Sequence, residues 1–212
     1  AYFDLFKPYK EHHILDLKLP IEKSISKNKR KHARRALRKL KVDLDISPNI
    51  DLERWVKLYD CLIDRHQITG IRRFSRQTFR KQLAIPRTLC FNVYDNDRVV
   101  GANIYYLQGD VAYAHLSAFT AQGYASGAPY AVKWAAIQYL QKNIKAINFG
   151  GGTYKDQKES GGLDLFKQGW SNRTEKSYFC GKILNPAAFD ALCSDFDLND
   201  QDWFPGYRSN DY

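Results

Sequence analysis

Three strand-like segments follow one another between residues 88 and 119, and they constrain the fold more than any other part of the chain. They span residues 88–94, 98–107 and 111–119. An Asn-Asp turn joins the first two segments and a Gly-Asp turn joins the last two, and both turns favour hairpins. The sequence therefore predicts an antiparallel meander of three strands.

Helices and further strands surround this meander. Apolar residues at helical spacing predict helices at residues 51–66, 75–83, 129–143, 163–167 and 186–193. Strand-like runs lie at residues 42–46, 146–149 and 174–184. Because a helix connects the meander to the strand at 146–149, that strand is expected to pair in parallel. The expected fold class is α/β (α+β), with a mixed sheet, an antiparallel meander, a central helix-strand crossover and flanking helices.

Length and composition favour one intracellular domain. With 212 residues and 44% hydrophobic content, the chain can bury one large core but is short for two domains. No apolar run approaches the roughly 20 residues that span a bilayer, and the N-terminus lacks the charged-then-apolar order of a signal peptide. A cytoplasmic location is therefore expected. Since the chain contains no methionine, even at residue 1, we interpret it as a processed chain or as part of a longer one.

The four cysteines are expected to be reduced core residues. Cys61, Cys90, Cys180 and Cys193 are scattered singly in apolar surroundings. Their spacing matches neither the CxxC pairs of a zinc site nor the density of a disulfide framework. We therefore expect no bound metal.

The net charge of +10 comes from one segment, residues 23–41. It holds ten of the 33 Lys and Arg residues and no acid, and the other 23 basic residues equal the acidic ones in number. Pro20 fits the first turn of a helix, and an apolar stripe follows, so the segment is predicted to be one docked basic helix. Its charged face either holds phosphate, through Arg30, Arg34 and Arg35, or is solvated without a ligand.

The stretch 146–170 has the composition of a binding site. An apolar strand runs into three glycines at 150–152, whose missing Cβ atoms let a substrate approach the backbone N–H groups. Helical spacing then places Lys167 beside Phe166, and Trp170 closes the turn. A lysine held against aromatic side chains in a cleft stabilises developing negative charge. The alternative is a glycine-rich loop without a site.

The loop before the helix at 129–143 is a second candidate site. Ser126 is expected to cap the helix, Gly127 permits tight backbone geometry, and Pro129 fits the first turn. Free N–H groups and the helix dipole then form an arrangement that binds anions. Any capped helix offers the same groups, so this pattern gains weight from the glycine-rich strand end on the same edge of the sheet.

The strand at 111–119 offers a candidate for proton transfer. Alternation predicts that Tyr113, His115 and Ser117 share one face. His115 is therefore a candidate base, with a structural histidine as the alternative. No Ser-His-Asp set, HExxH helix or Walker loop is recognisable, which disfavours hydrolase, zinc-protease and P-loop functions.

The order of these elements resembles the GNAT acyltransferases, and more specifically the FemAB-like branch, which includes peptidoglycan-bridge aminoacyltransferases. The match covers the chain from about Leu15 to Leu184, and NFGGG and GGLDLFKQGW are its most distinctive parts. The usual GNAT pyrophosphate loop is present only loosely, as QGYASGA. The other matching segments are SKNKRKHARRALRKLKVDLDI, GANIYYLQGDVAYAHLSAF and APYAVKWAAIQYL.

The resemblance implies an N-acyltransferase of peptidoglycan or cell-envelope biosynthesis. Its co-substrate would be acyl-CoA or aminoacyl-tRNA beside the last meander strand, with no tightly bound cofactor, and its acceptor the amine of a small molecule or cell-wall precursor. Lys167 would polarise the reacting carbonyl or neutralise phosphate. Residues expected at the donor are Ser126, Gly127, Ala128, Tyr130, Gly150, Gly151 and Gly152. Residues expected at the substrates are Asn148, Tyr154, Phe166, Trp170, Arg30, Arg34 and Arg35.

The resemblance also implies a domain organisation. One GNAT-like domain would span residues 20–194, with an N-terminal connector at 1–19, which a missing lobe would precede, and a C-terminal tail at 195–212. A different class of function stays open, namely a non-catalytic RNA-binding or interaction module that uses the basic helix at 23–41. The glycine block with Lys167 favours the enzyme. No nucleic-acid recognition motif accompanies the basic helix, so sequence-specific binding is not expected.

Overall fold

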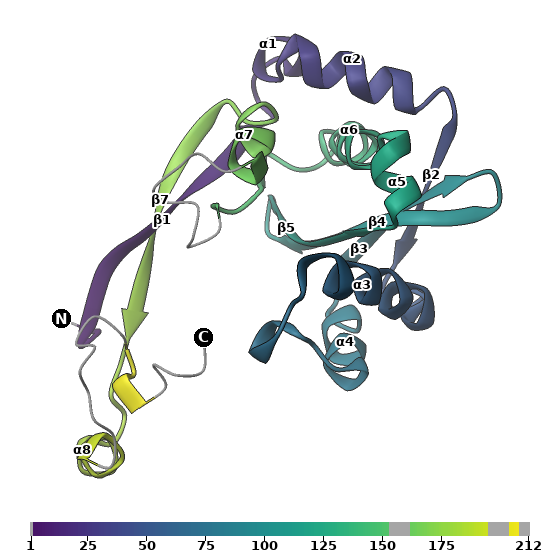
Figure 1. Ribbon diagram of the computed structural model, residues 1–212. Coiled ribbons are helices and arrows are strands. Elements are labelled where there is room, and N and C mark those ends of the chain that lie inside the picture. Colours follow the sequence, from purple (N-terminus) through teal and green to yellow (C-terminus); the bar gives the residue numbers. More distant parts are fainter. Residues whose placement is uncertain (1, 153–161, 195–203, 208–212) are drawn as a thin grey trace.

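The computed structural model describes residues 2–152, 162–194 and 204–207, and in these residues seven strands form one sheet (Figure 1). The strands lie in the order β2-β3-β4-β5-β6-β1-β7, and every neighbouring pair is antiparallel except β5 and β6. The predicted mixed sheet and its meander, β3-β4-β5, are therefore confirmed. The strands span Leu5–Asp16 (β1), Leu40–Ile46 (β2), Thr88–Asp95 (β3), Arg98–Gln108 (β4), Val111–Phe119 (β5), Ala146–Asn148 (β6) and Arg173–Gly181 (β7).

Helices cover both faces of this sheet (Figure 1). The helices α3 and α4 pack on one face around Trp55 and Phe79, and α6 packs on the other face around Val132 and Ile137. Because α6 connects β5 to the parallel strand β6, the predicted crossover is confirmed. The helices span Ile21–Ser24 (α1), Lys27–Ala36 (α2), Leu52–His66 (α3), Arg76–Leu83 (α4), Ala121–Ser126 (α5), Ala128–Leu140 (α6), Gly162–Gln168 (α7) and Pro186–Ser194 (α8), with a 3-10 turn at Gly70–Arg72.

The helix α6 is buried on nearly all sides because it lies between the sheet and α2 (Figure 1). Ala33 and Ala36 of α2 belong to the same core as α6. The sequence of α6 is correspondingly apolar around its circumference, as expected for an enclosed helix. Lys133 is its one charged residue and is itself buried.

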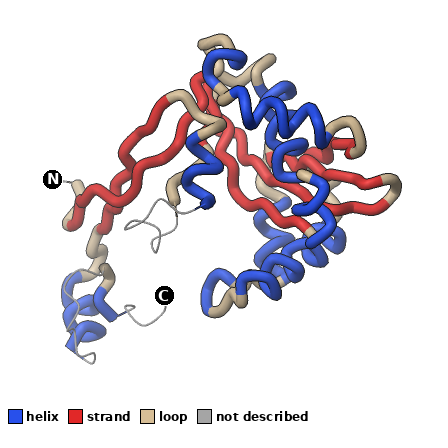
Figure 2. The backbone as a smooth tube through the Cα atoms, turned by 45° about the horizontal axis from the view of Figure 1, so that its top comes forward, coloured by secondary structure: helices blue, strands red, loops and turns tan. Residues whose placement is uncertain are grey.

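The strands β1 and β7 extend beyond the rest of the sheet as a two-stranded arm, with α8 near its end (Figure 1, Figure 2). The segment 1–19, expected to be a connector, therefore contains a strand, and Ile14 to Asp16 pair with β6. Sequence reasoning missed this strand because most of β1 is exposed or half-buried, so its apolar alternation is weak. Its partner β6 also lies some 130 residues away in the chain, which no local pattern reveals.

The basic segment differs from the single helix predicted for it. It forms α1 and α2, which are separated by Ile25, a buried residue with an extended backbone. The Ser26 hydroxyl accepts a backbone N–H hydrogen bond and starts α2 anew. The second helix ends at Ala36, and Lys41 already lies in β2, because pairing with β3 begins at Leu40.

Three of the four cysteines lie outside the core, which contradicts the expectation of core positions. Cys90 of β3 is buried, but Cys61 and Cys180 are exposed and Cys193 is half-buried. Cys180 lies on the thin arm, which has little interior to bury it, and all four cysteines are unpaired. Among the described residues, no group of His, Cys, Asp or Glu is arranged to hold a metal ion. No described helix combines the length and apolar composition needed to cross a membrane.

Candidate active site

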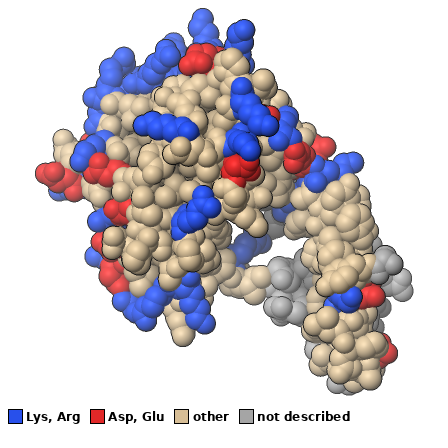
Figure 3. All heavy atoms as spheres, turned by 180° about the vertical axis from the view of Figure 1, so that it is seen from behind, with Lys and Arg blue, Asp and Glu red and all other residues tan. Residues whose placement is uncertain are grey.

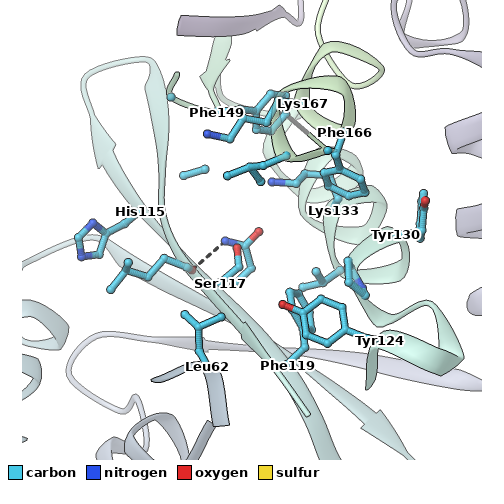
Figure 4. Close-up of a pocket in the computed structure, with 18 of the residues that line it drawn as sticks. Leu62, His115, Ser117, Phe119, Tyr124, Tyr130, Lys133, Phe149, Phe166 and Lys167 are labelled. Atoms are coloured by element: carbon cyan, nitrogen blue, oxygen red, sulfur yellow. Dashed lines mark hydrogen bonds between the residues drawn. The ribbon is translucent and has the colours of Figure 1, made fainter. Parts of the chain in front are cut away.

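A pocket of about 670 Å³ opens where β5 and β6 diverge (Figure 4). The two strands pair in parallel over only three residues, Val111 to Tyr113 on β5. The strand β5 then continues to Phe119, whereas the chain after β6 turns toward β1, where the Phe149 N–H donates to the carbonyl of His13. Residues of β5, α6, α7 and α3 line the space that this divergence leaves.

A bulge in β5 decides which of its side chains face this space. Between Ser117 and Ala114, β5 has one residue more than the facing part of β4. Ala114 therefore packs against the α6 side of the sheet, while Leu116 packs against the α3–α4 side. The prediction that Tyr113, His115 and Ser117 share one face is wrong, because the extra residue interrupts the alternation.

His115, the residue expected to act as a base, lies at the edge of the pocket. Its ring packs on Tyr106 with a centroid separation of 4.6 Å, and its Nε2 lies 3.3 Å from Oε1 of Gln82 on α4. Burial lowers the pKa of His115. Figure 4 shows that the imidazole points away from Lys133 and Lys167. The contacts of His115 are thus those of a histidine packed against α4.

Lys167, the expected catalytic lysine, lines the pocket from α7. Its ammonium donates a hydrogen bond to the carbonyl of Gly151 and lies 3.6 Å from the position that a Cβ would take on Gly150. Burial lowers the pKa of Lys167, the Asp164 carboxylate raises it, and Lys10 lowers it further. A partly desolvated ammonium of this kind interacts strongly with negative charge that develops beside it.

A hydrogen bond and a group of aromatic rings fix α7 in place. Oδ1 of Asp164 lies 2.8 Å from Nε2 of His13, a buried residue of β1. Phe166 packs edge-on against Tyr130 with ring centroids 5.3 Å apart, and both residues line the pocket. Trp170 is fully buried against these two rings. Trp170 therefore supports Lys167 from within the core and does not offer a surface to a substrate.

The glycine block serves backbone packing more than substrate approach. Gly150 has a φ of +72°, which favours glycine, and it borders the pocket. A Cβ on Gly151 would lie 2.8 Å from the carbonyl oxygen of Glu11, and a Cβ on Gly152 would lie 3.2 Å from Asp164. The latter two glycines thus let the chain pass close to β1 and α7, and the space above them is already occupied by protein.

Lys133 was missed by sequence reasoning, although it lines the pocket from α6. Its ammonium lies 4.5 Å from the ring centroid of Phe149 and 5.8 Å from that of Tyr105. Burial, followed by the nearby charge of Lys167, lowers the pKa of Lys133 to about 7. The signal in the sequence is a single charge in the otherwise uncharged helix APYAVKWAAIQYL. Figure 4 places both ammonium groups in the same part of the pocket, and we call Lys133 and Lys167 the lysine pair.

The predicted helix cap at Ser126 is wrong. Ser126 is the last residue of α5, a helix that the sequence analysis treated as a loop, and its hydroxyl donates to the carbonyl of Gly123. The cap of this shorter helix is Thr120, whose hydroxyl accepts from the Gly123 N–H. Ser126 therefore stabilises α5 and does not line the pocket.

The N-terminus of α6 has few free hydrogen-bond donors. Gly127, with a φ of +83°, links α5 to α6, and its carbonyl accepts from the N–H groups of Tyr130 and Ala131. Pro129 has no N–H, and Ala128 is fully buried. Of the residues expected here at the donor, only Tyr130 lines the pocket. The predicted anion site at this helix end therefore has few free N–H groups that could bind a phosphate.

The three arginines expected to contact phosphate lie on α2, outside the pocket lining. Arg30 donates to a backbone carbonyl of its own segment, and Arg34 and Arg35 are exposed. Figure 3 shows Lys and Arg gathered along the upper edge of the molecule, where α1 and α2 lie. Closer to the pocket, α2 contributes Lys29, whose ammonium lies 4.5 Å from the ring centroid of Phe166. The basic face of α2 and the pocket thus remain separate features.

Asn148, another residue expected at the substrates, does not line the pocket. Asn148 braces the start of the glycine block, because its Oδ1 accepts from the Gly150 N–H at 2.7 Å. Its Nδ2 lies 3.2 Å from Nδ1 of His12, another residue of β1. Tyr154 lies outside the described residues, as do its neighbours Lys155 and Asp156.

Sequence comparison identifies a family for most of the chain. Residues 27–158 match the family model described as an acetyltransferase (GNAT) domain. A comparison with curated proteins returns no significant match. The matched segment contains the whole meander, α6 and the glycine block, so it includes most of the pocket.

Solved structures share the fold at low sequence identity. The crystal structure of FemX has a TM-score of 0.69 at 12% identity, with 88% of this chain and 68% of that one covered. The C-terminal domain of a putative lysylphosphatidylglycerol synthetase from Agrobacterium fabrum has a TM-score of 0.66 at 14% identity, with 90% and 66% covered. The chain thus spans about two thirds of the length of these structures.

A smaller relative in fold is matched over nearly its full length. An aminoglycoside acetyltransferase from an uncultured soil metagenomic sample, solved with sisomicin, has a TM-score of 0.52 at 15% identity. The match covers 70% of this chain and 98% of that one. At these identities the likeness concerns the fold, and function has to be argued from the site.

Proposed function

The chain belongs to the acetyltransferase (GNAT) domain family, and from this premise we propose that it transfers an acyl or aminoacyl group from an activated donor to an amine. The acceptor is an amine of a small molecule or of a cell-wall precursor. The amine attacks the donor carbonyl directly, so that the acyl group passes to nitrogen without a covalent enzyme intermediate.

The observation that carries this proposal is the lysine pair in an otherwise largely apolar pocket. The donor carbonyl lies beside β5, and the Lys167 ammonium faces the negative charge that forms on its oxygen during attack. Lys167 is suited to this task because the Gly151 carbonyl and the anchored helix α7 hold it in position before the reaction starts. The rings of Phe149 and Phe166 exclude water and strengthen the interaction.

The helix ends suggest which donor is used. Coenzyme A as acyl donor needs a phosphate site near the acyl group. At the N-terminus of α6, most backbone N–H groups are already hydrogen-bonded within the protein. The exposed basic residues of α2 supply phosphate contacts at another place, over a longer surface. We therefore favour an aminoacyl ester of tRNA as the donor, with acyl-CoA as the alternative.

The test is a comparison of both donors with the same protein. Acetyl-CoA and radiolabelled aminoacyl-tRNA are each incubated with a panel of primary amines that includes ethanolamine, an aminoglycoside and a lysine-containing peptide. We expect label transfer from aminoacyl-tRNA and thermal stabilisation by it. Transfer from acetyl-CoA alone would reassign the donor. RNA binding without transfer from either donor would instead support a non-catalytic module that uses α2.

A further inference from the structure

Lys133 occupies a position that few lysines occupy in folded proteins. Its residue surface is 8% exposed, and it projects from the most enclosed helix of the fold. Its ammonium faces the rings of Phe149 and Tyr105, and Figure 4 shows it directed toward the space beside Lys167. The side chain therefore enters the pocket from a buried helix.

No carboxylate compensates this charge in the described part of the chain. Among the described residues, Lys133 forms neither an ion pair nor a hydrogen bond, and the residues that line the pocket include no Asp or Glu. Nearby polar groups are also incompletely paired, since the Tyr105 hydroxyl and Oδ1 of Asn103 are buried without partners. Buried polar groups of this kind are rare and mark positions with a role beyond stability.

We propose that Lys133 is the base that removes the proton from the attacking amine, an inference that rests on the proposed acyl transfer. The neutral lysine takes one proton from the acceptor nitrogen as the new C–N bond forms. The bond between the carbonyl carbon and the ester oxygen or thioester sulfur of the donor then breaks. The proton passes from Lys133 to that leaving oxygen or sulfur. The products are an amide and the free hydroxyl or thiol, and the enzyme returns to its initial state.

The proton affinity of Lys133 suits this step. Burial and the adjacent Lys167 charge lower its pKa to about 7, which makes the neutral form of Lys133 accessible near neutral pH. An ordinary lysine would be almost fully protonated there and would hold no lone pair for the proton. The lysine pair therefore divides the work between a neutral base and a cation that faces the carbonyl oxygen.

Among the other titratable groups around the pocket, His115 and Tyr105 are less well placed. His115 is bound to Gln82 and packed on Tyr106, away from the lysine pair, and His66 lines the pocket from α3. The pKa of Tyr105 is raised by burial, so its phenol stays protonated. From α2, Lys29 and His32 face the ring of Tyr130.

Two measurements test the inference. In protein with isotope-labelled lysine side chains, the Lys133 resonance, assigned by its loss in Lys133→Met, should titrate near pH 7. In acyl transfer from the active donor, the turnover of wild type should rise with pH and level off above this value. Both Lys133→Met and Lys133→Arg should lose about 100- to 10,000-fold in turnover, with donor KM changed less than about threefold. Lys142→Met, in the exposed turn that follows the same helix, serves as the control.

The arginine variant separates the proposed role from a structural or electrostatic one, because arginine keeps the charge and does not deprotonate. Wild-type turnover and an unchanged pH profile in Lys133→Arg would overturn the inference while leaving acyl transfer intact. A Lys133 resonance that remains protonated above pH 9 would overturn it as well. Absence of transfer by wild type from either donor would refute the proposed function, and with it the role of Lys133.

Discussion

The two faces of the sheet differ in whether their charged side chains have partners of opposite charge. On the α3–α4 side, Arg54 lies 2.9 Å from Asp45 and 3.4 Å from Asp51. Asp45 also accepts a hydrogen bond from the buried Asn92. On the α6 side, Lys133 has no carboxylate partner among the described residues, and its nearest charge is another lysine. In the described part of the chain, Arg54 on one face is thus paired with carboxylates, whereas Lys133 on the other face is not.

This difference distinguishes charged side chains that stabilise the fold from charged side chains that are available for a reaction. A buried charge without a partner lowers stability, whereas a paired one is close to neutral or stabilising. We call the face that carries Lys133 the unpaired face, because Lys133 has no carboxylate partner among the described residues. It borders the pocket, which makes the lysine pair the centre of the proposed chemistry.

Apart from the Lys133 variants, the largest expected effect concerns Lys167. If its ammonium stabilises charge on the carbonyl oxygen, Lys167→Ala should lower turnover by about 100- to 1,000-fold, equivalent to about 2.7–4 kcal/mol. Donor affinity should change much less. Steady-state rates and the melting temperature are measured in parallel. Near-wild-type turnover in a folded variant would show that Lys167 only packs its stem against Phe166, and that the unpaired face holds no catalyst at this position.

A second prediction compares how one charged residue on each face affects the free energy of unfolding. Lys133→Met removes an uncompensated buried charge and should raise the free energy of unfolding at pH 6–7 by about 1–3 kcal/mol, since one unit of pKa depression corresponds to about 1.4 kcal/mol. Arg54→Met leaves Asp45 and Asp51 without their partner and should lower the free energy of unfolding by about 1–2 kcal/mol. Chemical denaturation of both variants at the same pH gives the two values.

The pH dependence of the free energy of unfolding provides a further check on the comparison of wild type with Lys133→Met. The pKa of Lys133 is lower in the folded protein than in the unfolded chain, so the unfolded chain binds the extra proton between about pH 7 and pH 10. This group therefore makes wild type gain stability as the pH rises through that window, and Lys133→Met should lack that contribution. If Lys133→Met instead destabilises the protein at neutral pH, the lysine supports the fold and the contrast between the faces fails.

The sequence predicted the elements whose determinants are local. The meander rests on two turns and three apolar runs, and Ser75 caps α4 through its contact with the Thr78 N–H, all within a few residues. The strand β1 was missed because its partners lie far away in sequence and its faces are mostly exposed. The helix α5 was missed because Ser126 and Pro129 suggested one cap, whereas Thr120 provides an earlier one.

The site was predicted only in part, for the same physical reason. Lys167, Phe166, Tyr130 and Gly150 line the pocket as expected. The role of Lys133 depends on burial between the sheet and α2, and on contact with Phe149, none of which a residue pattern encodes. Likewise, the bulge that moves His115 toward α4 comes from the register between two strands, which is set by the packing of both faces.

The smallest expected effect concerns the basic face of α2. If aminoacyl-tRNA is the donor, the double variant Arg34→Glu, Arg35→Glu should weaken donor binding by less than about tenfold at 0.15 M salt, with turnover at saturation unchanged. Each lost phosphate contact should reduce the slope of log affinity against log salt by about 0.7–0.9. The matched control is Lys57→Glu, Lys81→Glu, which changes the same charge at exposed positions of α3 and α4. Equal losses in both variants would mean that net charge alone attracts the donor, and no loss in either would make α2 a solvated face. Only a loss confined to α2 would place the phosphate contacts on the same side of the sheet as the lysine pair.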